Sequence, residues 1–202
     1  MVIVAIAGGT GSGKTTLAKK IIDSYQNIKI NYLSLDSYYK DFSQMSFTER
    51  SKINFDHPDS IDFDLFYQQI NEYLKGSDIK TPTYSYKRHK RLKKKGNLRQ
   101  GDLLIVDGIL ILLKKSIRDF FDLSIFLKVN SSERLKRRIR RDINERGRSK
   151  IEISDRFYNM IKPMHKKYVK PSENFADVVL GEDYDYELIK IKIDQLLNGN
   201  HK

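Results

Sequence analysis

The sequence predicts a three-layer α/β/α fold around a central, mostly parallel sheet of five strands. Two observations carry this prediction. Residues 2–7 are apolar throughout, as in a strand covered on both faces, and they lead directly into a glycine-rich segment and then into apolar residues at helical spacing. Further along, short apolar runs alternate with segments of helical periodicity, which is typical of parallel strands joined by crossover helices.

The expected elements follow one another without a linker or an internal repeat, so we expect a single domain over residues 1–202. Ligands of open α/β sheets bind at the carboxyl ends of the strands, and two segments are expected to project there as a hairpin and a lid. The expected strands are residues 2–7, 30–35, 103–106, 123–129 and 178–180. The expected helices include residues 17–25, 63–74, 135–143 and 186–197, with the hairpin at about 80–100 and the lid at about 133–155.

The glycine-rich segment matches the pattern G-x-x-x-x-G-K-[ST] in full, with a strand before it and a helix after it. In this pattern backbone N–H groups and the helix N-terminus hold phosphate groups, which predicts binding of a nucleoside triphosphate. Lys14 is expected to reach the β- and γ-phosphates, and the Thr15 hydroxyl a Mg²⁺ ion. The residues of this phosphate-binding loop are Gly8, Gly9, Thr10, Gly11, Ser12, Gly13, Lys14, Thr15 and Thr16.

Composition limits the function classes. The formal net charge of +12 implies a polyanionic partner, which nucleotide phosphates, nucleic acid or a membrane surface would each satisfy. No apolar run reaches the roughly 18 residues of a membrane span, and no basic region precedes the first apolar run, so we expect neither a membrane helix nor a signal peptide. The absence of cysteine excludes disulfides and thiolate metal sites and suits a cytoplasmic enzyme.

Two expected strands end in an aspartate. Asp107 closes the run 103–106, and this arrangement is typical of a carboxylate that orders Mg²⁺ beside the loop threonine, although Asp107–Gly108 is also a turn dipeptide. Asp36 follows the run 30–35. Its spacing from the glycine loop resembles that of a ribose-binding acid in dinucleotide folds, but the Gly-Lys-Thr ending favours phosphoryl transfer, with Asp36 as a base. A turn or helix-cap role for Asp36 stays open.

The segment after residue 130 is rich in arginine. A narrow apolar stripe of Leu135, Ile139 and Ile143 lies beside an arginine face, and a glycine is expected to end the helix. Phosphoryl transfer needs mobile positive charge that closes over the phosphates, so this segment is expected to form a lid; a solvated basic face is the alternative. The arginines concerned are Arg134, Arg138 and Arg141 on one face, with Arg146 and Arg148 on either side of Gly147.

Together these motifs resemble the uridine (uridine–cytidine) kinases of the P-loop kinase superfamily, along nearly the whole chain. The glycine loop alone indicates only the superfamily, whereas Asn-Phe-Asp-His-Pro-Asp at 54–59 and Arg-Asp-Ile-Asn-Glu-Arg-Gly-Arg at 141–148 are far more specific. The other matching stretches are residues 8–16, 35–40, 82–86 with His89, 107–110, 118–119 with 122–123, 137–138, 162–163, and 171–172 with 175–177.

The resemblance implies a kinase that transfers the γ-phosphate of ATP or GTP, with Mg²⁺, to the 5′-hydroxyl of uridine or cytidine. Asp36 would be the catalytic base, acting with Lys14 and with the lid residues Arg138 and Arg141. Thr15 and Asp107 would hold the metal. On the acceptor side, Tyr39 would lie beside the nucleoside, Asp56 with Phe55 would meet the ribose, Tyr84 and His89 would meet the pyrimidine, and Arg148 would lie near the sugar.

The chain departs from the family pattern at three places. Asp107 stands where the family usually has glutamate, and the shorter side chain suits a metal held through water. Arg156 stands where the family has a substrate-side glutamine, which replaces a neutral donor and acceptor by a donor-only cation and favours a more anionic acceptor. Residues 181–183 replace a Pro-Arg-Gly, so the family's adenine-side contacts are not carried over.

Two alternative functions stay open. One is another P-loop small-molecule kinase, resembling phosphoribulokinase or pantothenate kinase or acting on a different nucleoside, and Arg156 is the feature that keeps it open. The other is an RNA-binding protein that uses the nucleotide site as a switch, which the basic run 87–95 suggests and which predicts salt-sensitive RNA affinity. We expect a small-molecule substrate without nucleic-acid or membrane partners. The resemblance implies a homo-oligomer, often a tetramer.

Overall fold

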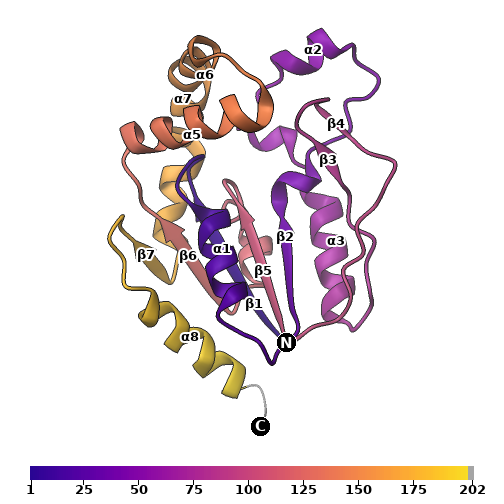
Figure 1. Ribbon diagram of the computed structural model, residues 1–202. Coiled ribbons are helices and arrows are strands. Elements are labelled where there is room, and N and C mark those ends of the chain that lie inside the picture. The colour runs from indigo at the N-terminus through magenta and orange to yellow at the C-terminus, as the bar shows by residue number, and fades with distance from the viewer. Residues whose placement is uncertain (200–202) are drawn as a thin grey trace.

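The computed structural model in Figure 1 describes residues 1–199 and has a five-stranded parallel sheet at its centre. The strand order is β2-β5-β1-β6-β7, and all neighbouring pairs run parallel, which confirms the predicted fold class. The strands are β1 (Val2–Gly8), β2 (Ile30–Ser34), β5 (Leu103–Gly108), β6 (Leu123–Leu127) and β7 (Val178–Leu180).

Strand β1 is buried along its whole length because helices cover both faces of the sheet. Its alternate side chains enter two separate apolar clusters. Val2, Val4 and Ile6 pack in one cluster with α1 (Lys14–Asp23) and α8 (Tyr186–Gly199). Ile3, Ala5 and Ala7 face the other cluster, which contains the buried face of α3 (Phe63–Leu74). The continuous apolar run that predicts this strand therefore reflects cover on two sides.

The remaining elements lie mainly beyond the carboxyl ends of the strands, where Figure 1 shows α5, α6 and α7 opposite α2 and the β3–β4 pair. Strands β3 (Tyr84–Ser85) and β4 (Lys90–Arg91) pair antiparallel as a short hairpin. The helices are α2 (Phe47–Lys52), α4 (Lys115–Arg118), α5 (Ser131–Arg146), α6 (Lys150–Arg156) and α7 (Lys162–Met164). The short 3-10 helices are η1 (Leu35–Tyr38), η2 (Pro58–Ser60) and η5 (Lys170–Phe175), and the π-helical segments are η3 (Phe157–Ile161) and η4 (His165–Val169).

The observed elements differ from the expected ones mostly at their ends. Strand β2 stops at Ser34, and Asp36 lies in the 3-10 turn η1 that follows it. Asp107 lies inside β5 rather than after it. Helix α5 ends at Arg146 before Gly147, whose left-handed φ of 66° suits a glycine at this position. Along residues 1–199, no helix combines the length and the apolar character needed to cross a membrane.

Candidate active site

The phosphate-binding loop connects β1 to α1 in a conformation that requires glycine. Gly11 has a φ of 77°, and a Cβ atom added there would lie 2.4 Å from the carbonyl oxygen of Arg134. Gly13 has a φ of 99° and caps α1. The Lys14 ammonium donates to the carbonyl oxygens of Gly8 at 3.0 Å and Gly9 at 3.2 Å, which holds it at the mouth of the loop. Loop, lysine and helix N-terminus together form a cradle that fits a chain of phosphates.

Two oxygen-bearing side chains meet beside this loop. The Thr15 hydroxyl donates to Asp107 Oδ2 at 3.2 Å, from strand and helix positions 92 residues apart. Asp107 is only 3% exposed, and this burial raises the pKa of its carboxyl while the nearby Lys14 ammonium lowers it. A hydroxyl and a carboxylate are hard oxygen ligands of the kind that Mg²⁺ prefers, so the donor set fits this metal. Residues 1–199 contain no cluster of three or more His, Asp or Glu side chains of the kind that could hold a metal ion.

A cavity of about 670 Å³ joins the phosphate loop to the hairpin and the lid. Asp36 lines it from η1, opposite the loop, and its Oδ2 accepts a hydrogen bond of 3.2 Å from the Tyr86 hydroxyl. The cavity brings together every acceptor-side residue that the sequence analysis named. Its lining includes Thr10, Lys14, Thr15, Thr16, Asp36, Tyr39, Phe55, Asp56, Tyr84, His89, Asp107, Arg138, Arg141, Arg148 and Arg156.

Part of the cavity wall is aromatic. The Tyr39 ring meets the rings of Phe55 and Tyr84 edge-on at centroid distances of 5.0 and 5.1 Å. Phe55 also stacks on His89 at 5.4 Å, with 16° between the ring planes. Asp56 lies beside these rings; burial raises the pKa of its carboxyl, and Arg138 opposes that shift. Flat apolar walls with one carboxylate suit a ligand that has both a ring and hydroxyl groups.

His89 is held neutral at the wall of this cavity. It is 8% exposed and has a left-handed φ of 49°, which is uncommon for a residue other than glycine. Burial, with a smaller effect from the surrounding arginines, of which Arg148 is the strongest, lowers the pKa of His89 to about 4. Its Nε2 lies 3.5 Å from Arg148 Nη2. At neutral pH the ring therefore has one nitrogen that donates and one that accepts.

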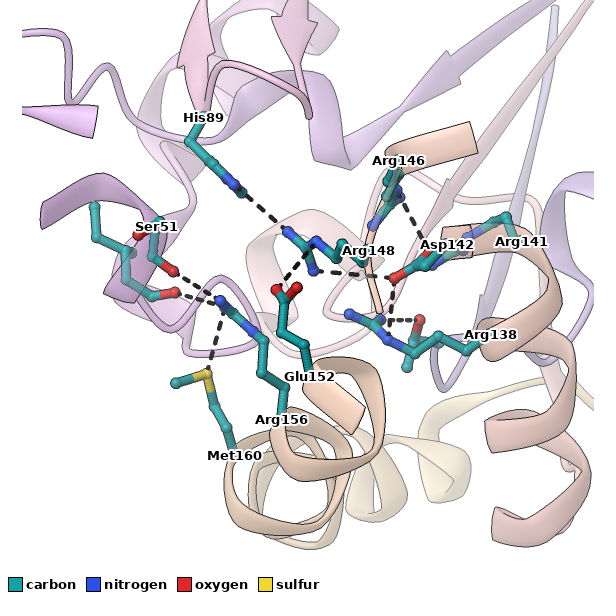
Figure 2. Close-up of polar contacts among 12 residues, drawn as sticks. Ser51, His89, Arg138, Arg141, Asp142, Arg146, Arg148, Glu152, Arg156 and Met160 are labelled. Carbon is teal, nitrogen blue, oxygen red and sulfur yellow. Dashed lines mark hydrogen bonds and ion pairs between the residues drawn. The ribbon is translucent and has the colours of Figure 1, made fainter. Parts of the chain in front are cut away.

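Asp142 lies at the centre of the arginine cluster in the predicted lid, as Figure 2 shows. Its carboxylate is 0% exposed and lies 2.8 Å from Arg141 Nη2 and 3.4 Å from Arg138 Nε. Arg146 Nε at 3.5 Å and Arg148 Nη1 at 4.0 Å complete the cluster. Burial alone would raise the pKa of Asp142, but the arginines around it produce a net lowering. One carboxylate thus holds four guanidinium groups above the cavity.

The lid also contacts the phosphate loop directly. Arg138 is 7% exposed, and its Nη1 donates to the Thr10 hydroxyl at 2.7 Å. Burial lowers the pKa of Arg138 and Asp142 partly opposes that shift; the resulting value of about 10 keeps the guanidinium charged at neutral pH. Two predicted lid residues, Arg138 and Arg141, therefore line the cavity, and Arg138 connects it to the phosphate loop.

Comparison with known proteins identifies the family. The sequence model of the Phosphoribulokinase / Uridine kinase family matches residues 3–185. The chain belongs to this family. It is 41% identical to a uridine kinase of Streptococcus pyogenes serotype M5 over 90% of this chain and 87% of that one, and 36% identical to a uridine kinase of Clostridium novyi over 98% of both chains. The phosphoribulokinase of Rhodobacter spheroides shares the fold, with a TM-score of 0.67 at 15% identity over 89% of this chain and 69% of that one.

Arg156 makes backbone contacts that could not be predicted from the sequence. It lines the cavity from the end of α6, but its Nη1 donates to the carbonyl oxygen of Ser51 at 2.7 Å and its Nη2 to that of Ile53 at 3.3 Å. These carbonyls lie at the C-terminal end of α2, where helix carbonyls lack partners within the helix. Arg156 therefore connects α6 to the segment that carries Phe55 and Asp56. Its Nη1 and Nη2 donate to backbone carbonyls.

Among the residues to which the sequence analysis gave no role in the site are Tyr86, Asp142 and, as a cavity residue, Arg146. Asp142 left a signal, because an acid four residues after Arg138 within a basic run faces the same side of a helix. The only sequence signal for Tyr86 was its position in the hairpin motif. Its contact with Asp36 joins residues 50 positions apart, which periodicity cannot show.

Proposed function

We propose that the protein is a uridine kinase, which transfers the γ-phosphoryl group of ATP or GTP to the 5′-hydroxyl of uridine or cytidine and gives UMP or CMP. The observation that carries the proposal is that one cavity is lined by Lys14 of the phosphate cradle, by Asp36, and by Asp56 and His89. The relatives named uridine kinase, which match nearly the full chain, support the same acceptor.

On the donor side, the backbone N–H groups of the loop and the Lys14 ammonium bind the triphosphate. Thr15 and Asp107 would hold Mg²⁺, which supplies charge neutralisation on the phosphate oxygens when bound. Arg138 and Arg141 reach over this end from the lid and offset the negative charge that is spread over the transferring group.

In the proposed step, Asp36 accepts the proton of the 5′-hydroxyl as the hydroxyl oxygen bonds to the γ-phosphorus. The bond from the γ-phosphorus to the β,γ-bridging oxygen breaks in line, and ADP or GDP leaves. The proton on Asp36 then passes to solvent. On the acceptor side, Asp56 accepts hydrogen bonds from ribose hydroxyls, Arg148 lies near the sugar, and the rings of Tyr39, Phe55 and Tyr84 enclose the nucleoside.

The remaining parts of the proposal rest on the resemblance to uridine kinases. The protein would work in the cytoplasm as a homo-oligomer, with a tetramer as the expected form. The alternative acceptors, a phosphosugar or pantothenate, are disfavoured because Arg156 Nη1 and Nη2, the two terminal donors that would meet an additional anionic group, already donate to the carbonyls of Ser51 and Ile53.

A panel of acceptors tests the proposed function. With ATP and Mg²⁺ in excess and ADP release coupled to a spectroscopic readout, we expect kcat/KM for uridine or cytidine to exceed that for ribulose 5-phosphate and for pantothenate by at least about 100-fold, because sites built to hydrogen-bond one acceptor reject others strongly. Preferential turnover of the phosphosugar would contradict the acceptor assignment and leave the kinase class intact.

The neutral state of His89 predicts a flat pH response of acceptor binding. A histidine whose pKa is about 4 keeps the same charge across the neutral range, so KM for uridine should change less than about twofold between about pH 5.5 and pH 8. A histidine with an ordinary pKa of about 6.5 would gain a proton in this interval. Initial rates at several uridine concentrations check this, and a KM that rises steadily below about pH 6.5 would show that His89 titrates there.

A further inference from the structure

Tyr86 connects the lid to Asp36 through two contacts on opposite parts of one side chain. Its hydroxyl donates to Asp36 Oδ2 at 3.2 Å, and the guanidinium carbon of Arg146 lies 4.4 Å from the centre of its ring. Arg146 in turn pairs with the buried Asp142 at 3.5 Å. A continuous set of contacts thus runs from the centre of the lid, through the hairpin, to the carboxylate that faces the acceptor.

The hydrogen bond occupies only one oxygen of the Asp36 carboxylate. Among residues 1–199, Oδ1 has no hydrogen-bond partner, so it remains available to a hydroxyl group in the cavity. Loss of water around the Tyr86 hydroxyl, together with the Asp36 charge, raises the pKa of Tyr86 well above its ordinary value. The hydroxyl is therefore protonated at any pH at which the protein works, and it acts toward the carboxylate as a donor.

The Tyr86 ring is held on two sides although 37% of the residue is exposed. Tyr84 meets it edge-on at a centroid distance of 5.7 Å, with 76° between the planes. Arg146 stacks on it as a planar cation, an arrangement that arginine adopts readily on aromatic faces. Because Asp142 fixes Arg146, the place of the ring, and with it that of the hydroxyl, follows the place of the lid.

We propose that Tyr86 is a positioning residue, which holds the Asp36 carboxylate with one oxygen toward the acceptor hydroxyl, and that Arg146 makes this position depend on the closed lid. The inference rests on the proposed role of Asp36 as base. General-base transfer depends steeply on geometry, and a displacement of about 1 Å can lower a rate about 100-fold. The Asp36 side chain on the short turn η1 can rotate about its own bonds, and the hydrogen bond from Tyr86 restricts that rotation.

Tyr86→Phe tests the hydroxyl alone, because it keeps the ring and its contact with Arg146. We expect kcat to fall about tenfold, with KM for uridine and for ATP changed less than about twofold, since the hydroxyl orients Asp36 and does not bind either substrate. The melting temperature should stay within about 1 °C of the wild type, as expected for a partly exposed site. Tyr67→Phe, on an exposed tyrosine of α3, is the matched control. A wild-type kcat in Tyr86→Phe would overturn the positioning role.

The link to the lid is tested by combining two variants. Arg146→Gln alone should lower kcat by about as much as Tyr86→Phe. The kcat of the double variant should lie within about twofold of that of either single variant, because both substitutions interrupt the same chain of contacts to Asp36. Fully multiplicative losses would overturn the lid dependence. Asp36→Asn separates this inference from the proposed function: turnover in that variant would remove the base itself, whereas an inactive Asp36→Asn beside an unaffected Tyr86→Phe would remove only the role of Tyr86.

Discussion

Asp36→Asn is expected to lower kcat for uridine phosphorylation by about 10³-fold or more, the upper part of the range that general-base catalysis contributes. Asparagine has nearly the shape of aspartate, and its amide oxygen can still accept the hydrogen bond from Tyr86. It cannot take a proton from a hydroxyl. The loss should therefore fall on kcat, measured by ADP release at saturating uridine, and the dissociation constant for ATP should change less than about threefold.

The control for this variant is Asp23→Asn, which makes the same chemical change at the exposed end of α1 and should keep wild-type turnover. A calorimetric titration of each variant with ATP measures binding separately from turnover. Near-normal turnover in Asp36→Asn would show that another group accepts the proton. Lost ATP binding would instead place Asp36 on the donor side of the cavity.

Much of the fold could be predicted from the sequence because its determinants are local. The apolar run 2–7, the glycine loop and the spacing of apolar residues in α1 each act over fewer than about ten residues, and together they define one strand–loop–helix unit. Asp36 and Asp107 were also predictable as neighbours, since the ends of parallel strands meet at one edge of a sheet. The Thr15–Asp107 hydrogen bond agrees with the expected position of Asp107 beside the loop threonine.

The lid was predicted less well because burial there depends on pairing between charges. Periodicity marked an apolar stripe on α5, but Ile143 is 43% exposed, whereas Arg134 is 2% and Asp142 0% exposed. Arginine and aspartate are rarely buried alone, so a sequence pattern assigns them to the surface. On this helix the charged face packs against the phosphate loop, where Arg138 reaches Thr10.

Contacts between distant segments account for the other omissions. Arg156 was placed beside the substrate from the family pattern, and it does line the cavity, yet its nearest partners are backbone oxygens 105 and 103 residues away. Tyr86 reaches Asp36 across 50 residues. Neither contact follows from local spacing, because both arise where the hairpin, α2 and α6 converge over the sheet.

Asp142→Asn is expected to have the second large effect, on stability and turnover together. The substitution leaves Arg138, Arg141, Arg146 and Arg148 around a neutral side chain, although all four lie within 4.0 Å of the carboxylate in the wild type. Removing one partner of a buried ion pair costs about 3–5 kcal/mol. The lid arginines would also separate, so we expect kcat to fall about 100-fold through lost charge stabilisation. Urea unfolding and ADP release measure the two effects.

The pH dependence of stability distinguishes the lost charge from a change of shape. Because the arginines lower the pKa of Asp142 in the folded protein, its contribution is complete above the unfolded value of about 3.9 and is lost as pH falls through the folded value. The wild type should therefore be more stable than Asp142→Asn at neutral pH, and this difference in unfolding free energy should shrink as the pH falls below about 3.9. Asp155→Asn, on the exposed surface of α6, should follow the wild-type curve throughout. A difference between wild type and Asp142→Asn that does not shrink on acidification would mean that the carboxylate acts through packing, and the arginine segment would then be held by the Arg138–Thr10 contact instead.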